Sequence, residues 1–172
     1  NNVSHNYINT SGTIGNFGII LYSIVFNNNV SNNYINTSGT SGNYGILLQT
    51  NANNNTITGN TIRSGGSAGT NYGIYLLSTV IGNNVSHNYI NTSGTTANYG
   101  IYLLTNAFKN NVSYNLIRTN GTSGIAHYGI YVDASSNNTL TSNIINASAG
   151  SSSIRLENNY ADNNNFTNNT IL

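Results

Sequence analysis

The 172-residue sequence holds few side chains that could do acid–base chemistry: the acids Asp133, Glu157 and Asp162, and three histidines. Asp133 and Glu157 occupy the same position in successive copies of a sequence repeat. Stacked copies would place their carboxyl groups about 5 Å apart, near the separation in a retaining glycosidase. Arg155 lies on the same predicted outward face and can pair with Glu157 instead. We interpret these acids as part of a surface ion pair and predict no catalytic residues and no enzymatic activity.

The histidines do not predict a metal site. His5 and His87 occupy equivalent positions three copies of the repeat apart, about 14 Å in a stacked structure, which is too far for one metal ion. His127 lies at a different position in its own copy. The sequence has no Cys, no periodic Asp of the kind that calcium-binding nonapeptides carry, and no phosphate-binding loop. We therefore expect no metal and no cofactor.

The composition excludes several classes of partner. Lys+Arg number 4 and Asp+Glu number 3, for a net charge of +1. So few cations form no basic patch, which argues against nucleic-acid binding. No apolar run approaches the roughly 20 residues of a membrane span. The sequence also contains no Met, which predicts a processed chain or a piece of a longer protein.

The elements that must position these side chains come from an internal repeat. The segment NNVSHNYINTSGT begins at Asn1 and recurs intact at Asn83, and five weaker copies bring the total to seven, at spacings of 26 to 28 residues. Two positions carry asparagine in every copy. They are Asn1, Asn28, Asn55, Asn83, Asn110, Asn138 and Asn164, and Asn6, Asn33, Asn60, Asn88, Asn115, Asn143 and Asn169. Because stacked copies place identical residues above one another, we predict two inward amide ladders at the corners.

A second block lies between the copies and predicts a strand. It reads FGIIL from Phe17, YGILL from Tyr44, YGIYLL from Tyr72 and from Tyr99, and YGIYV from Tyr128. Apolar residues alternate in it with period two, and no segment sustains the 3.6-residue period of a helix. Short strands separated by Asn, Ser, Thr and Gly at a period near 27 predict an all-β fold. We expect residues 1–172 to form a single parallel β-solenoid of about six coils, stacked about 4.8 Å apart.

The alternation of YGIYL with NNTITGNTI resembles the parallel β-helix repeat of right-handed pectate-lyase-like proteins, over essentially the whole chain. The resemblance implies a right-handed coil. It implies little about function, because this fold carries lyases, hydrolases, epimerases, tailspikes, adhesins and structural rods. The sequence lacks the acid clusters that mark the polygalacturonase-like and pectate-lyase-like enzymes of this fold.

Strand alternation directs a set of large apolar side chains away from the predicted core. These are Tyr75, Tyr102 and Tyr131, with Leu77 and Leu104 two residues after the first two. Monomers rarely leave such a contiguous stripe bare. Three coverings are open: an interface between proteins, a flanking segment, or a sugar stacked on the rings. The one-coil spacing favours lateral packing of identical rods.

The sequence favours a structural role outside the cell. Both ends fall within the repeat without a capping segment, so we expect a slice of a longer solenoid or coils of successive subunits that stack end to end. The predicted function is a structural subunit of an extracellular filament, sheath or surface layer, with the chain itself as partner. The alternative is a carbohydrate-binding or carbohydrate-processing β-helix of the adhesin or tailspike kind. An ice-binding solenoid would need a flat T-x-T array, and the TSGT threonines lie in a predicted corner.

Glycans are a further predicted partner. The sequence has thirteen N-x-S/T sequons, and the absence of Cys and Met fits a long-lived extracellular or cell-surface protein. We predict glycans at sequons in the corners, because sequons beside the strands lie close to paired backbone. The predicted sites are Asn9, Asn36, Asn91, Asn120 and Asn146.

Overall fold

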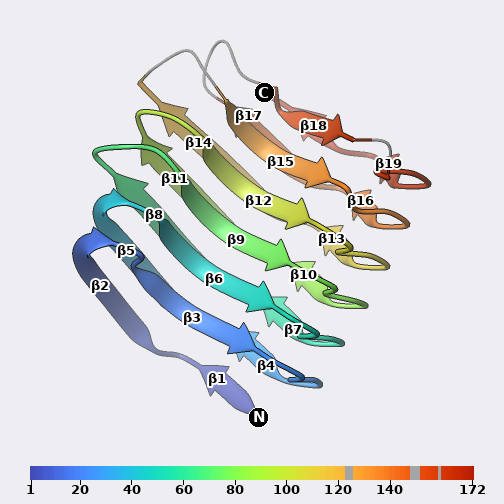
Figure 1. The fold of residues 1–172 in the computed structure, drawn as a ribbon, viewed down its shortest axis with the longest axis horizontal. Helices are drawn as coiled ribbons and strands as arrows, with labels where there is room; N and C mark the ends of the chain where they lie inside the picture. Colours follow the sequence, from blue (N-terminus) through green and yellow to red (C-terminus); the bar gives the residue numbers. More distant parts are fainter. Residues whose placement is uncertain (123–125, 148–151, 159) are drawn as a thin grey trace.

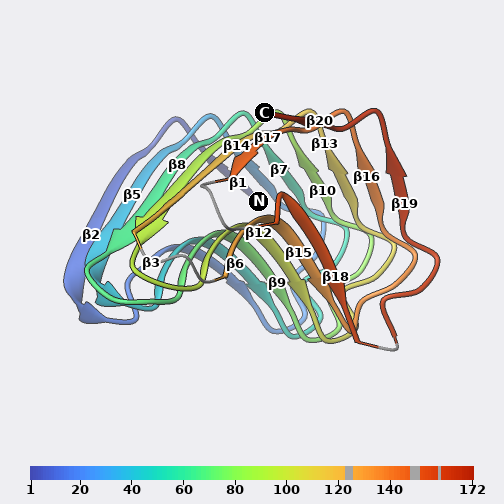
Figure 2. The same cartoon turned by 90° about the horizontal axis from the view of Figure 1, so that it is seen from above.

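The computed structural model describes residues 1–122, 126–147, 152–158 and 160–172, and every regular element within them is a β-strand. The strands form three parallel sheets, to which each successive coil adds one strand (Figures 1 and 2). There are six complete coils, and β19 and β20 begin a seventh. The two termini lie at opposite ends of the stack (Figure 1). The predicted all-β parallel solenoid of about six coils is confirmed.

The sheets are named A, B and C in the order in which the chain meets them. Sheet A holds β1 (Asn2–Ser4), β4 (Asn29–Ser31), β7 (Thr56–Thr58), β10 (Asn84–Ser86), β13 (Asn111–Ser113), β16 (Thr139–Thr141) and β19 (Asn165–Thr167). Sheet B holds β2 (Tyr7–Ile14), β5 (Tyr34–Ser41), β8 (Thr61–Gly66), β11 (Tyr89–Gly94), β14 (Leu116–Gly121), β17 (Ile144–Ala147) and β20 (Thr170–Ile171). Sheet C holds β3 (Phe17–Tyr22), β6 (Asn43–Gln49), β9 (Asn71–Leu77), β12 (Asn98–Leu104), β15 (His127–Asp133) and β18 (Ile154–Glu157).

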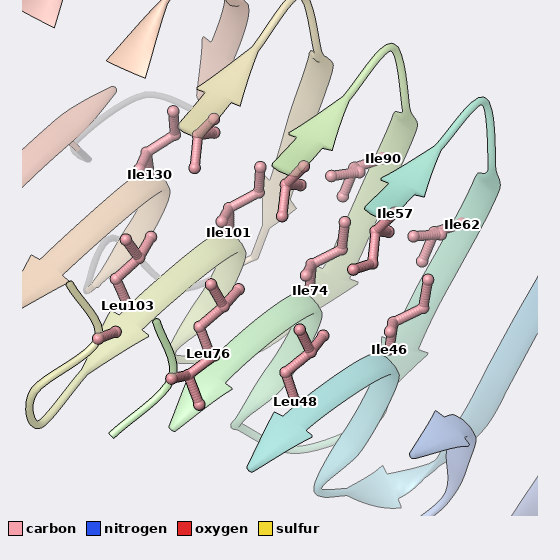
Figure 3. Close-up of a cluster of buried hydrophobic side chains, with 14 of the residues drawn as sticks. Ile46, Leu48, Ile57, Ile62, Ile74, Leu76, Ile90, Ile101, Leu103 and Ile130 are labelled. Carbon is pink, nitrogen blue, oxygen red and sulfur yellow. The ribbon is translucent and has the colours of Figure 1, made fainter. Parts of the chain in front are cut away.

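The core consists of aliphatic columns that run along the axis. Strands pair in register, so Ile74 lies between Ile46 and Ile101 in sheet C, and Ile90 pairs with Ile62 in sheet B. Figure 3 shows these side chains meeting in the interior, where all of them are 0% exposed. Burying one such side chain stabilises a fold by about 1.5–3 kcal/mol. An apolar side chain is therefore needed at the same place in every coil.

Both predicted asparagine ladders are present, one at each end of sheet A. In each column the Nδ2 of one asparagine donates to the Oδ1 of the next, over 2.9–3.1 Å along the first column and 2.9–3.0 Å along the second. A central member such as Asn88 also accepts the backbone N–H of Asn60 and donates to the carbonyl of Ile57. These amides satisfy backbone groups that the turn between strands leaves unpaired.

The left-handed backbone conformation falls on the residue before each ladder asparagine, not on the asparagine itself. His87, for example, has φ 56° and precedes Asn88, and Lys109 has φ 57° and precedes Asn110. A non-glycine residue pays about 1–2 kcal/mol for this conformation. The ladder hydrogen bonds hold the turn against that cost.

A third amide ladder lies at the start of sheet C and was not predicted. It runs through Asn16, Asn43, Asn71 and Asn98 with Nδ2–Oδ1 distances of 2.7–2.9 Å. In the next coil His127 replaces asparagine, and its Nδ1 lies 3.0 Å from Asn98 Nδ2. His127 is 0% exposed. Each corner of the coil thus carries its own column of side-chain hydrogen bonds.

The ladder makes a direct prediction about stability. Replacing Asn88 with Leu takes the acceptor from the Asn60 backbone N–H and the amide donor from the carbonyls of Ile57 and Ser86, of which Ser86 still accepts from the Gly59 N–H. Each buried polar group left unpaired costs about 1–3 kcal/mol. We expect Asn88→Leu to lower the free energy of unfolding by about 3 kcal/mol or more in denaturant titration. The outward Asn91 of the same coil is the matched control, and Asn91→Leu is expected to cost less than about 1 kcal/mol. Equal midpoints for Asn88→Leu and the wild type would contradict the ladder.

A column of inward threonines makes a second prediction. Thr37, Thr92 and Thr119 are 0–1% exposed, and their hydroxyls have no hydrogen-bond partner among the described residues. Ser64, in the same column, donates instead to the backbone carbonyl of Asn43. A buried hydroxyl without a partner destabilises a fold.

Replacing Thr92 with Val keeps the shape and removes the unpaired hydroxyl. We expect Thr92→Val to raise the free energy of unfolding by about 1 kcal/mol. Thr92→Ser, which keeps the hydroxyl and loses the methyl group, is expected to lower it. A loss of stability in the valine variant would show that the hydroxyl is satisfied.

Candidate functional site

The outer side of sheet C carries two columns of stacked tyrosine rings. The first column is Tyr44, Tyr72, Tyr99 and Tyr128, and the second is Leu47, Tyr75, Tyr102 and Tyr131. Ring centroids within a column are 4.7–5.1 Å apart and nearly parallel. Between columns they are 5.1–5.5 Å apart and edge-to-face. Both arrangements are favourable for aromatic pairs.

The residues between the two columns, Gly100 and Ile101 in β12, both face the core, which interrupts strand alternation and brings the columns to the same side. Tyr99 and Tyr102 are three residues apart, and Gly100 lies between them in β12. A Cβ at Gly100 would lie 2.2 Å from Ile117 Cγ2 and 2.5 Å from the carbonyl oxygen of Gly129, so only glycine fits. Figure 2 shows the strands of sheet C following a bent path whose concave side faces away from the core. The tyrosines fill this concave side, which we call the tyrosine groove.

The prediction that the apolar stripe of sheet C is exposed is wrong. Tyr75, Tyr102 and Tyr131 lie on the outer side as expected but are only 7–8% exposed, while Leu77 and Leu104 are half-buried. The physical reason is that strand alternation fixes which side a residue faces, whereas the bend and the ring stacking decide how much water it meets. Ring faces cover one another along each column, which disfavours stacking of a sugar there. A protein interface at these five residues stays a prediction.

The charged residues near the groove engage one another. Arg155 Nε lies 2.9 Å from Glu157 Oε2, and its guanidinium lies 5.2 Å from the ring centroid of Tyr128. The Tyr131 hydroxyl donates to the same oxygen of Glu157 over 2.5 Å. Asp133, which pairs with Glu157 in register, accepts from Asn158 and, at 3.4 Å, from the Tyr131 hydroxyl. The predicted pairing of Arg155 with Glu157 is confirmed.

The surroundings of Glu157 do not suit a general acid. The hydrogen bonds from Arg155 and from Tyr131 lower the pKa of the Glu157 carboxyl below its usual range. A retaining glycosidase needs one carboxyl whose pKa is raised, so that it stays protonated at neutral pH. The pKa of Glu157 is shifted in the opposite direction.

The histidines lie apart. His5 and His87 are exposed, and His87 stacks on Tyr114 with centroids 5.1 Å apart, while His127 is buried in the third ladder. No group of three or more His, Cys, Asp or Glu that could hold a metal ion occurs among the described residues.

The predicted glycosylation sites lie in strands, which corrects their assignment to corners. Asn9, Asn36, Asn91, Asn120 and Asn146 all belong to sheet B, whose first two strands run through the TSGT segments to Ile14 and Ser41. Neighbouring members touch: Asn36 donates to Asn9 over 2.9 Å and Asn120 to Asn91 over 2.8 Å. These sites therefore lie as close to paired backbone as the sequons that we excluded, and glycans on neighbouring members would crowd one another. Glycan attachment itself stays a prediction.

The nearest match to a T-x-T array lies on sheet A rather than in the TSGT segments. Its outward positions carry Asn or Thr, followed two residues later by Ser or Thr. Ser31, Ser86 and Ser113 are only 4–6% exposed. Asn29 donates to Ser31 over 3.1 Å and Asn111 to Ser113 over 3.2 Å. These three serines are recessed, whereas Thr167 of the same column is exposed, so the column does not present the flat array that ice binding requires.

Comparison of the chain with protein-family models, curated protein sequences and solved structures gives no match. The resemblance to pectate-lyase-like repeats, and the right-handed coil that it implies, therefore stay predictions. Among the described residues, no helix is long and apolar enough to cross a membrane.

The tyrosine groove predicts a loss of stability in alkali. Burial, the largest cause, raises the pKa of Tyr99 to about 12 and raises those of Tyr72, Tyr75, Tyr102 and Tyr131 further. Between about pH 10, where an unfolded tyrosine ionises, and these higher values, the unfolded chain holds fewer protons than the folded one. The stabilisation is therefore complete below pH 10 and is lost as pH rises through the folded-state pKa values.

We expect the free energy of unfolding to be level from pH 8 to about pH 10 and to fall steadily above it. Denaturant titrations at each pH measure it, with phenolate absorbance as a second signal. Tyr102→Phe removes one of these groups and should make the fall shallower. An identical slope in that variant would refute the linkage.

Proposed function

We propose that this chain is a structural rod, a building element of an extracellular filament, sheath or surface layer. The supporting observation is that its three amide ladders and its aliphatic core columns run along the stack in one direction and one register. Successive coils repeat the same kinds of contact along the two ladders that flank sheet A and along the core columns, so resistance to bending is distributed along the axis. The groups that carry this pattern are uncharged.

The ladder polarity supports assembly from end to end. Each asparagine donates through Nδ2 toward the higher-numbered coil and accepts through Oδ1 from the lower-numbered one. A further coil of the same motif before Asn1 or after Asn169 would meet the matching donor or acceptor. This holds whether that coil belongs to the same chain or to another copy. A net charge of +1 offers little repulsion between copies.

A carbohydrate-binding rod is the second candidate. The observation that favours it is the outer face of sheet B, where arginines lie over tyrosines beside a row of amides. Carbohydrate processing has less support, because Glu157 is held ionised by Arg155. Glycans on the rod and an extracellular setting remain part of the proposal.

Electron microscopy and light scattering of the purified chain test the structural role. We expect single fibrils whose growth depends on protein concentration. Ile171 continues an inward column in β20, so a charge there would be buried when another coil stacks on it. We expect Ile171→Lys to stop elongation, whereas Ser93→Lys, which adds the same charge to an outward position, should not. A wild-type chain that stays monomeric at high concentration would contradict the assembly.

A further inference from the structure

The outer face of sheet B repeats a set of three side chains every two coils. Tyr34 and Asn36 lie in one coil, and Arg63 lies beside Asn36 in the next coil. Tyr89, Asn91 and Arg118 stand in the same relation, each 55 residues further along the chain. Over these four successive coils, the outward columns thus alternate between a coil with Tyr and Asn and a coil with Arg. The backbone does not require this alternation, because the strands of sheet B pair in the same register from one coil to the next.

Each arginine is held by its tyrosine rather than by a carboxylate. The guanidinium of Arg63 lies 5.8 Å from the ring centroid of Tyr34, and that of Arg118 lies 6.0 Å from the ring centroid of Tyr89. Both arginines are exposed. A guanidinium over an aromatic ring keeps its N–H donors at its edge, directed toward solvent, and its side chain is partly ordered in advance.

The positive charge of this face has no neutralising partner in the part of the chain that the structure describes. The one ion pair there is Arg155–Glu157, on the outer side of sheet C. Asp133 also lies on sheet C, and Asp162 follows that sheet's last strand. Lys109 lies at another corner, with Nζ 5.5 Å from the ring centroid of Phe108. Arg63 and Arg118 therefore present two equivalent cations on an otherwise uncharged sheet.

We propose that the outer face of sheet B binds a linear acidic polysaccharide with one carboxylate or sulfate per disaccharide, lying along the solenoid axis. Two coils span about 10 Å, which is close to the length of one disaccharide in an extended glycan. Successive acidic groups would then meet Arg63 and Arg118, each of which can form a two-point hydrogen bond with an oxyanion. This inference goes beyond the structural role and does not depend on end-to-end assembly.

The polar groups in the coils next to the arginines suit sugars better than bases. Asn36 and Asn91 offer amides, and Ser38 and Ser93 offer hydroxyls, in outward positions of the same strands. Single-stranded nucleic acid would need free aromatic faces for base stacking. The ring of Tyr34 has Arg63 near one face and Tyr7 stacked 5.1 Å away. The face therefore favours a ligand that uses charge and hydroxyl groups.

Calorimetric titration with a hyaluronan hexasaccharide, which carries one carboxylate on each disaccharide, tests the proposal. We expect binding that weakens with salt, as charge pairing requires. Arg63→Gln and Arg118→Gln should each weaken it about fivefold, the size of one exposed charge contact. The double variant should lose it, and the matched control Lys109→Gln should bind as the wild type does. Far-UV circular dichroism checks that every variant keeps the fold.

A change of spacing at constant charge gives the sharper test. Asn91 lies between Arg63 and Arg118 in the same outward column. The double change Asn91→Arg with Arg118→Asn therefore brings the two cations from two coils apart to one coil apart. This double change should weaken the binding of the hyaluronan hexasaccharide. It should strengthen the binding of an oligogalacturonate, which carries a carboxylate on every sugar.

Three results would overturn the proposal. One is equal binding of neutral cellohexaose by the wild type. Another is binding of hyaluronan that none of the arginine changes alters. The third is tighter binding of single-stranded DNA with the same dependence on both arginines, which would identify a general polyanion site instead.

Discussion

Stacking of coils in exact register is the constraint on which the rest of the structure depends. Neighbouring coils share their backbone hydrogen bonds, so each paired strand residue lies above its counterpart 24 to 29 positions away. An apolar side chain must then pack on an apolar side chain, and an amide must face an amide.

The apolar columns and the amide ladders differ in how much exchange they tolerate. The aliphatic columns tolerate exchange among Val, Ile, Leu and Phe at sheet A, as Val112, Leu140 and Phe166 show, whereas the two ladders that flank sheet A carry asparagine in all seven coils. A hydrogen-bonded column needs one particular shape, while an apolar column needs only volume.

The sequence was sufficient for the parts of the fold that this register dictates. The two asparagine ladders and the core columns could be predicted because the same residue types recur at a near-constant period. The third ladder was missed because Asn16, Asn43, Asn71 and Asn98 precede a Tyr-Gly or Phe-Gly pair and look like loop residues, and because His127 breaks the column. A signal was available in the asparagine that directly precedes the aromatic residue in four successive blocks.

The tyrosine groove could not be predicted from alternation. A period of two assigns Tyr102 to the outer side, but it does not show that Gly100 and Ile101 both face the core, so that Tyr99 reaches the same side and packs on Tyr102. Likewise, the sequons of sheet B looked like corner residues because Asn, Ser, Thr and Gly are typical of turns. In this sheet the strands continue through them, because inward Thr37 and Thr92 and outward Asn36 and Asn91 alternate as a strand requires. Composition was misleading where position decided the structure.

The direction of the hydrogen bonds has a mechanical consequence. Bonds between coils lie along the rod axis, so tension applied to the two ends of the chain loads the outermost coil before any other. Each coil is hydrogen-bonded only to the coils directly before and after it. No described strand crosses several coils to share the load. The rod would lengthen under force by unwinding whole coils in sequence, each releasing about 90 Å of extended chain at about 3.4 Å per residue. A material made of such rods would dissipate mechanical energy in equal steps as coils unfold. It would refold coil by coil when the tension falls.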